Sequence, residues 1–353
     1  MVDQTRVARE RRALAAAPEL TYLFWEATRR CNLRCRHCGS SCEVEAQSRE
    51  LSTEEILRIV HEIAEDFDAG AICCAITGGE PLLRRDLETV VQEMSALALE
   101  AGIVTNGSFL DAERARSLVD AGLLTVSVSL DGREAEHDAI RGAGSFRSAL
   151  AAMQHAASVD LHVEAITCVR PANLAGLSEL ERQVRDAGAE DWRLITIDRM
   201  GRVAGDKDPH TWLEPAAAEA LLDFVAARRR ALRDDEHFEV SFSCGGYLGP
   251  RREAEVRDRG SQCYAGLAIG GILADGQVSA CPSLPRYLAQ GSALERRFGE
   301  IWREGFAVHR DLDAMRRQEP CSDCDWYNLC LGGGLHERLA QPDDFCWLKR
   351  QHP

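Results

Sequence analysis

The chain lacks three features that mark common classes of protein. Lys and Arg number 42 against 57 Asp and Glu, so there is no basic excess and the net charge is −15. Nucleic acid and anionic membranes both bind clusters of basic residues, so neither is expected as a partner. No stretch approaches the roughly 18 apolar residues of a membrane span. The first 20 residues also have no apolar signal-peptide core. We therefore expect a cytoplasmic protein.

What the chain does contain is a large apolar fraction and many cysteines. Hydrophobic residues make up 45% of its 353 residues, which is typical of globular proteins. At about 150 residues per domain, the length indicates about two domains. The 14 cysteines are the most informative part of the composition. In a reducing compartment, clustered cysteines are metal ligands more often than disulfides.

From residue 20 to 205, short apolar runs typical of strands alternate with helix-length amphipathic stretches. The six expected strands are 22–28, 71–77, 102–105, 124–130, 161–169 and 193–198. This alternation predicts parallel strands joined by crossover helices. We expect an α/β fold, a partial six-stranded barrel of the TIM type or a wound sheet. In either fold, ligands bind at the carboxyl ends of the strands.

Local signals mark where several helices begin. Ser52 and Glu55 form a capping-box pattern, which predicts a helix that starts at residue 53. Asp111 is expected to open a second helix, and Asn173 a third that ends near Gly188.

The pattern changes after residue 205. Residues 206–260 are expected to connect two domains, with a helix at 215–232 and a short strand at 238–243. Residues 261–353 are rich in Cys and Gly, and they predict a smaller domain held by metal. Asp275-Gly276 between two apolar runs predicts a hairpin there. Residues 1–19 form a polar lead-in.

The first cysteine cluster directly follows the first expected strand. Cys31, Cys35 and Cys38 place three thiolates in one tight loop, which suits a thiophilic metal centre. Three protein ligands leave one coordination site open, and open sites carry out chemistry. The spacing is not that of a structural zinc ribbon, although packed or zinc-binding cysteines are the alternative.

Other glycine-rich or polar segments follow the expected strands in order. They are Gly78-Gly79-Glu80 after the second strand, Asn106-Gly107 after the third, Ser127 and Ser129 in the fourth, and His137 to Arg141 after it. Together with the cysteine loop, these segments resemble the radical S-adenosylmethionine (SAM) superfamily over residues 20–200. In that family the three cysteines bind three irons of a [4Fe-4S] cluster, and SAM binds the fourth iron.

The resemblance implies a set of SAM-binding residues. They are His37 near the adenine, Gly78, Gly79 and Glu80 around the amino group, Ser129 at the ribose with Ser127 on the same strand face, Arg141 at the carboxylate, and Asn106 in a segment that recurs in relatives. The two glycines lack a Cβ, so backbone carbonyls can approach the amino group closely. The alternatives are a spectator role for His37, ordinary strand polarity for the serines and a surface salt bridge for Arg141.

The C-terminal cysteines resemble the SPASM domain, an extension of radical SAM enzymes that carries auxiliary iron–sulfur clusters. In the family pattern one complete cluster has four cysteine ligands, which here are Cys321, Cys324, Cys330 and Cys346. Cys263 and Cys281 belong to a second cluster. One cysteine of that pattern is replaced by Gly334, so the second cluster lacks ligands. Cys244, Asp275, His336 or substrate are candidates; an empty second site and a zinc site are the alternatives.

Cys244 lies in a glycine-rich turn after the strand expected at 238–243. We weigh three roles for it: a cluster ligand, a thiol that returns a hydrogen atom to a substrate radical, and a structural residue. The other cysteines, Cys42, Cys73, Cys74 and Cys168, are expected to be packing residues.

The resemblance implies an oxidoreductase or epimerase that cleaves SAM reductively to a 5′-deoxyadenosyl radical, which removes a hydrogen atom from the substrate. The leading expectation is cross-linking, oxidation or epimerisation of a ribosomally made peptide. An aminocyclitol, amino sugar or porphyrin-type precursor is the second, and a non-catalytic iron–sulfur electron carrier is the third. Expected partners are an electron donor such as flavodoxin or ferredoxin and, for a peptide, a separate leader-peptide-binding protein.

Overall fold

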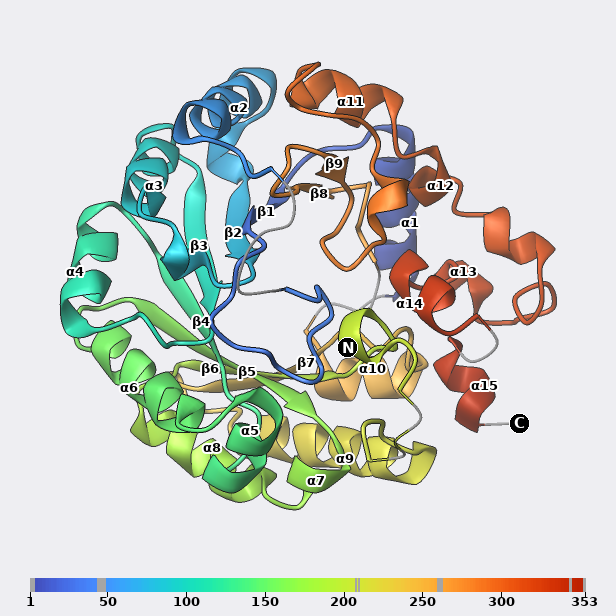
Figure 1. The fold of residues 1–353 in the computed structure, drawn as a ribbon. Coiled ribbons are helices and arrows are strands. Elements are labelled where there is room, and N and C mark those ends of the chain that lie inside the picture. The colour runs from blue at the N-terminus through green and yellow to red at the C-terminus, as the bar shows by residue number, and fades with distance from the viewer. Residues whose placement is uncertain are drawn as a thin grey trace.

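The protein is built around one nine-stranded sheet (Figure 1). The computed structural model describes residues 4–42, 49–206, 208, 210–258, 263–342 and 345–351. The strands are β1 (Tyr22–Thr28), β2 (Cys73–Gly78), β3 (Glu100–Thr105), β4 (Thr125–Ser129), β5 (His162–Val169), β6 (Asp191–Thr196), β7 (Glu239–Ser243), β8 (Ile269–Ile272) and β9 (Val278–Ser279).

Seven strands follow one another in the sheet in chain order. Each of β1 to β6 pairs in parallel with the next strand along the chain. On the free side of β1, β8 pairs in parallel and β9 pairs antiparallel with β8. The expected partial barrel with a cysteine-rich C-terminal part is therefore confirmed, and the parallel part of the sheet is extended by a strand on each side, β8 beside β1 and β7 beside β6. Of these two strands, β7 was expected in a connecting segment.

The helices cover the outer face of the curved sheet (Figure 1). Those between the parallel strands are α2 (Thr53–Asp66), α3 (Leu87–Ala96), α4 (Ala112–Asp120), α5 (Glu134–Arg141), α6 (Ser145–Ala157), α7 (Pro171–Leu174), α8 (Leu177–Asp186) and α9 (Pro215–Ala231). Side chains alternate along each strand. Val163 and Ala165 of β5 are fully buried, whereas the intervening His162 and Glu164 remain partly exposed.

The predicted helix starts are confirmed except at Asn173. The capping box of Ser52 and Glu55 opens α2 as predicted, and the Asp111 side chain accepts from Arg114 N at the start of α4. Asn173 does not open a long helix. It lies inside the single turn α7, and its Nδ2 donates to the Asp131 carbonyl at 3.0 Å as well as to the nearby Cys168 carbonyl. A tertiary contact therefore uses an amide that the sequence alone indicated as a cap.

The C-terminal part adds six helices, from α10 (Pro250–Val256) and α11 (Phe298–Glu304) through α12 (Ala307–Arg310), α13 (Tyr327–Cys330) and α14 (Leu335–Ala340) to α15 (Trp347–Gln351). The predicted hairpin at Asp275-Gly276 is confirmed, since β8 and β9 flank it. This hairpin extends the main sheet, so the sheet crosses the boundaries proposed at residues 205 and 260.

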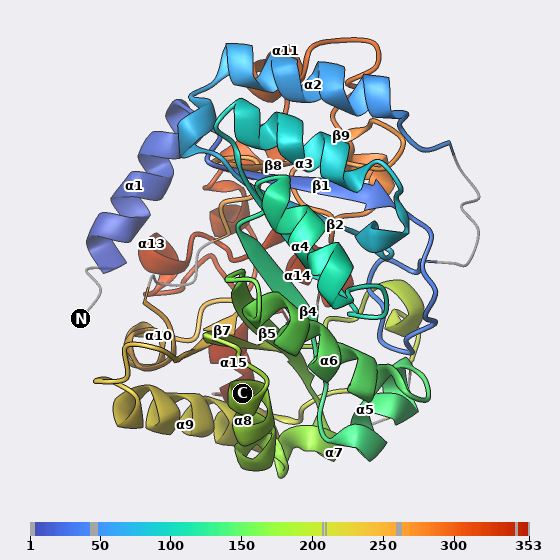
Figure 2. The same ribbon diagram turned by 90° about the vertical axis from the view of Figure 1, so that its left-hand side faces the viewer.

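The polar lead-in contains α1 (Gln4–Ala16), which packs against α12 and α13 (Figure 2). Ala8 of α1 shares a small second core with Leu267, Leu312, Cys321 and Tyr327. The two ends of the chain are therefore packed together. Among the described residues, no helix combines the length and apolar character needed to cross a membrane.

Candidate active site at the carboxyl ends of the strands

The cysteine loop, residues 31–38, begins three residues after β1. Cys31 and Cys35 are buried and Cys38 is half-buried. Burial raises the pKa of Cys31 to about 11, and the charges of Cys35 and Cys38 act in the same direction, so the three sulfurs are close enough to interact. Arg202 Nη1 donates to the Cys35 carbonyl at 2.9 Å and secures the loop from the far side of the barrel. This grouping of soft donors fits an iron–sulfur cluster.

The glycines at the end of β2 contact the residues that immediately precede the cysteine loop. Gly78 has φ +136°, and a Cβ there would lie 2.3 Å from the Thr28 carbonyl oxygen. A Cβ on Gly79 would lie 2.0 Å from the Arg30 carbonyl oxygen. The chain's own backbone thus requires both glycines, because the two loops pack without side chains between them. The predicted approach to a SAM amino group stays a prediction.

Glu80 is fully buried, and its side chain accepts hydrogen bonds from its own loop and from the loop after β3. Its carboxylate accepts from Thr105 Oγ1 at 2.7 Å, Asn106 N at 2.8 Å and Leu82 N at 3.1 Å. Asn106 in turn donates to Asn32 Oδ1 at 2.9 Å. The loops after β2 and β3 and the cysteine loop are therefore linked through one carboxylate.

Asp131, at the end of β4, is the hub of a second network that sequence reasoning missed. Its carboxylate is fully buried and accepts from Arg141 Nε at 2.5 Å, His37 Nε2 at 2.9 Å and Cys168 N at 2.8 Å. Burial would raise the pKa of Asp131, but Arg141 and His37 outweigh it and hold that pKa well below its usual range. The signal was a charged residue directly after a buried strand.

The structure places the other expected SAM residues as follows. Arg141 is buried against Asp131 and is not in a surface salt bridge. His37 Nδ1 is buried and has no hydrogen bond within the described residues. Ser127 Oγ donates to Glu164 at 2.5 Å, and Ser129 lies two residues further on the same face of β4. Their roles toward SAM stay predictions.

Cys42, which was expected to be inert, contacts the cysteine loop. Its thiol hydrogen-bonds to the Cys38 sulfur, and this contact is the main cause that lowers the pKa of Cys38. The Cys42 carbonyl also accepts from Arg202. Cys42 is therefore a neighbour of the candidate metal ligand Cys38.

The tail cysteines, Cys321, Cys324, Cys330 and Cys346, come together around α13. Burial raises the pKa of Cys321, and the charges of Cys346 and Cys324 raise it further. Burial likewise raises the pKa of Cys330, and Cys346 and Cys321 are among the charges that add to this increase. Four sulfur donors from one short region fit a complete auxiliary cluster.

The hairpin cysteines, Cys263 and Cys281, form a separate group with His336. A hydrogen bond joins His336 to the Cys263 sulfur. Burial raises the pKa values of Cys281 and Cys244, and the charge of His336 opposes this increase. Burial lowers the pKa of His336, but hydrogen bonds to Asp198 and Cys263 outweigh it and raise that pKa to about 12. Asp275, the other candidate ligand, is paired with Arg286 at 2.8 Å.

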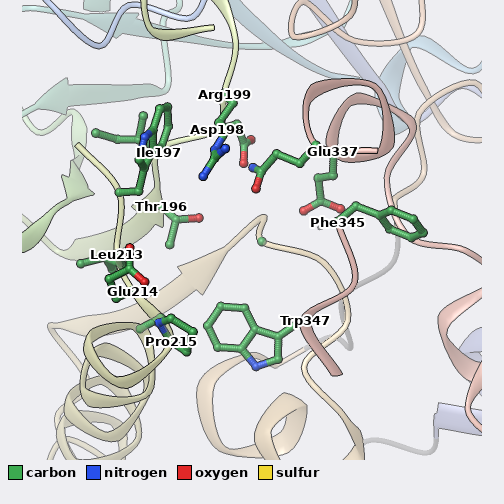
Figure 3. A pocket seen from close by; sticks show the side chains of 14 residues that line it. Thr196, Ile197, Asp198, Arg199, Leu213, Glu214, Pro215, Glu337, Phe345 and Trp347 are labelled. Atoms are coloured by element: carbon green, nitrogen blue, oxygen red, sulfur yellow. The ribbon is translucent and has the colours of Figure 1, made fainter. Parts of the chain in front are cut away.

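A cavity of about 280 Å³ lies at the carboxyl ends of β6 and β7 (Figure 3). Figure 3 shows Glu214 on one side and Glu337 on the other, with the Trp347 ring below them. Gly245, next to Cys244, lines the cavity, as do the neighbours of Cys346 on either side. The cavity is therefore lined by chain neighbours of Cys244 and Cys346. Largely enclosed pockets with a few convergent polar groups are the usual substrate sites.

Comparison with known proteins decides the family. Residues 25–186 match the sequence model of the radical SAM superfamily. Over 336 residues the chain is 30% identical to mycofactocin maturase MftC of Mycobacterium ulcerans, covering 92% of this chain and 87% of that protein. The chain belongs to the radical SAM superfamily. Its C-terminal cysteine groups make it a SPASM-type member, as the sequence indicated.

Two further likenesses agree with this assignment. The chain is 26% identical to the AdoMet-dependent heme synthase of Oleidesulfovibrio alaskensis, over 90% of this chain and 83% of that protein. The fold matches native anSMEcpe with bound AdoMet and Cp18Cys peptide at a TM-score of 0.72 and 18% identity, covering 95% of each chain. The cofactors of this radical SAM member are a [4Fe-4S] cluster, SAM and auxiliary iron–sulfur clusters, for which both cysteine groups supply donors.

The Asp131 network makes a prediction about stability. We expect Asp131→Asn to lower the free energy of unfolding by about 3–5 kcal/mol, because it leaves Arg141 buried without an anion. Asp138→Asn is the matched control, since Asp138 lies on the same helix as Arg141 and caps backbone N–H groups of Gly144 and Phe146. Asn also caps helices well, so the control should lose under about 1 kcal/mol. Urea unfolding under anaerobic conditions measures both; equal losses would contradict the role of Asp131.

Proposed function

We propose that this protein modifies a ribosomally made peptide by radical chemistry. The observation that carries the proposal is the 30% identity to mycofactocin maturase across more than nine-tenths of the chain. Cross-linking, oxidation and epimerisation of the peptide are the outcomes that this chemistry allows. The electron donor would be a flavodoxin or ferredoxin, and a separate protein would bind the leader peptide.

Cys31, Cys35 and Cys38 would hold the catalytic cluster. With SAM, this cluster supplies one-electron reductive cleavage and so the means to remove a hydrogen atom from an unactivated carbon. Arg141 offers a guanidinium for the SAM carboxylate, a charge-assisted contact. Asp131 accepts from Arg141 Nε and so orients it, while the Nη1 atom has no hydrogen bond within the described residues.

The substrate would enter the cavity between Cys244 and Cys346. Glu214, Glu337 and Asp198 line it with carboxylates, and Trp347 supplies an aromatic face. Carboxylates beside an aromatic ring suit a basic or amine-bearing group. The overall charge of −15 agrees with a basic peptide.

A second candidate is a porphyrin-type substrate, which the likeness to AdoMet-dependent heme synthase favours. The same cavity would then hold the macrocycle periphery, and no leader-binding protein would be needed. An aminocyclitol or amino sugar would also match the carboxylates of the cavity.

A direct comparison of substrates tests the proposal. We expect reconstituted protein with SAM and dithionite to form 5′-deoxyadenosine, and a short peptide encoded beside its gene to gain or lose mass. Iron coproporphyrin III and an amine-bearing cyclitol are the parallel incubations. Modification of the porphyrin alone would favour the second candidate. Absence of 5′-deoxyadenosine in every incubation would leave an electron carrier as the function.

Replacement of the cysteine loop ligands tests the cluster assignment. We expect wild-type protein to hold about eight or about twelve irons, and the triple variant Cys31→Ala, Cys35→Ala, Cys38→Ala to hold about four fewer. SAM cleavage should disappear because the open-site cluster is gone. Iron analysis and 5′-deoxyadenosine assays measure the two effects. Persistent cleavage would refute the assignment.

The role of Cys244 is testable by iron content and isotope together. If its thiol returns a hydrogen atom, Cys244→Ala keeps all its iron and yields dehydrogenated or shunt products, and wild-type product formed in deuterated buffer carries deuterium. If its sulfur binds a cluster, Cys244→Ala loses iron. Cys73→Ala serves as the control, since Cys73 is exposed on β2 and contacts Glu100. An unchanged product with unchanged iron would leave Cys244 structural.

A further inference from the structure

Two arginines lie among the auxiliary cysteines, one of them buried and the other half-buried. Arg11 of α1 is 4% exposed, and its Nη1 donates to the Cys330 carbonyl at 3.0 Å. Arg338 of α14 donates from Nη1 to the Gly332 carbonyl at 2.8 Å. Within the described part of the chain, neither guanidinium has a carboxylate partner. We call these residues the arginine pair.

A buried guanidinium without an anion is costly, so its neighbours are informative. Burial lowers the pKa of Arg11, and the groups that oppose burial are Cys263, Cys330 and a tyrosine. Burial likewise lowers the pKa of Arg338, opposed by Cys263, Cys321, Cys330 and a tyrosine. Tyrosine is neutral near pH 7. A cysteine thiol is deprotonated when it binds a metal, so the sulfurs of both auxiliary groups would compensate the charge of the arginine pair as cluster ligands.

Two side-chain nitrogens near the auxiliary cysteines lack a hydrogen-bond partner among the residues that the structure describes. Arg11 Nε and His309 Nε2 are buried and have no hydrogen bond within the described residues. Both residues line a cavity of about 20 Å³ together with Cys263 and Arg338. Arg11 Nε can only donate, so its lack of an acceptor in the described chain, beside the candidate metal ligand Cys263, indicates an anionic group next to this cavity, which itself has room for about one water molecule. An iron–sulfur cluster with thiolate ligands and bridging sulfides is such a group.

We propose that the arginine pair raises the reduction potential of the auxiliary clusters, which makes α1 part of the electron-transfer machinery. A nearby positive charge stabilises the reduced cluster, which carries one more negative charge, over the oxidised one. Charge and hydrogen bonds around the sulfurs are known determinants of cluster potential. This inference rests on the presence of auxiliary clusters and does not depend on which substrate is used.

The chain supplies a matched control one residue away. Arg12 follows Arg11 on α1, but it points outward and pairs with Asp313 at 3.1 Å. Substitution of Arg12 therefore changes the same net charge on the same helix without removing a charge from the cysteine groups. A general effect of α1 on folding would appear in both variants, whereas a local electrostatic effect would appear only at Arg11.

The experiment is an EPR-monitored redox titration of the intact, anaerobically purified holoenzyme. It follows the signals that SAM leaves unchanged, which belong to the auxiliary clusters. We expect Arg11→Met to lower the ratio of reduced to oxidised cluster about tenfold at fixed solution potential, which corresponds to 59 mV for a one-electron couple. Arg338→Met should shift the ratio in the same direction. Arg11→Lys and Arg12→Met should remain near wild type.

The outcomes decide the proposal. An unchanged potential in both Arg11→Met and Arg338→Met overturns it, and so does an Arg12→Met variant that shifts as far as Arg11→Met. If Arg11→Met loses its auxiliary iron, the potentials are measured in Arg338→Met and Arg11→Lys instead. A Lys variant that holds iron with a wild-type potential, beside a lowered potential in Arg338→Met, supports it. Failure to modify any peptide would leave these potentials unaffected, so the two proposals fail separately.

Discussion

The candidate active site depends on one buried carboxylate that the fold has to neutralise. Asp131 is fully enclosed, so its charge is tolerable only with paired donors around it. Arg141, His37 and the Cys168 amide supply them from α5, the cysteine loop and β5. Three separate segments are thereby held at the end of β4. The position of the cysteine loop is set by this requirement as much as by the strand that precedes it.

The segment just before the cysteine loop is held by backbone hydrogen bonds. Gly79 N donates to the Thr28 carbonyl and Glu80 N to the Arg30 carbonyl, at 2.7 and 2.8 Å. Glu80 then carries this link to the loop after β3. Ligands held from both sides keep their geometry, which a reactive metal centre needs. The carboxyl edge of a parallel sheet provides such support because all the strand-end loops meet there.

The auxiliary region is assembled from both ends of the chain. The hairpin of β8 and β9 extends the main sheet beyond β1 and brings Cys263 and Cys281 toward His336 and Cys244. From the other end of the sequence, α1 packs against α13 and places Arg11 beside Cys330. The C-terminal part is therefore continuous with the barrel through the sheet, which keeps the cavity next to the chain neighbours of Cys244 and Cys346.

The sequence by itself determined the features that depend on short separations. The capping box at Ser52, the hairpin turn at Gly276 and the three-cysteine loop are local patterns, and each of them has the expected local structure. Tertiary structure alone decided which groups meet across long separations: the carboxylate of Asp131 with His37, Arg11 with the Cys330 carbonyl, and the Asn173 amide with the Asp131 carbonyl instead of a helix end. These contacts depend on which strand ends adjoin in the sheet and on how α1 packs. No local periodicity encodes them, because the energy of a buried charge or amide is set by neighbours that only folding brings together.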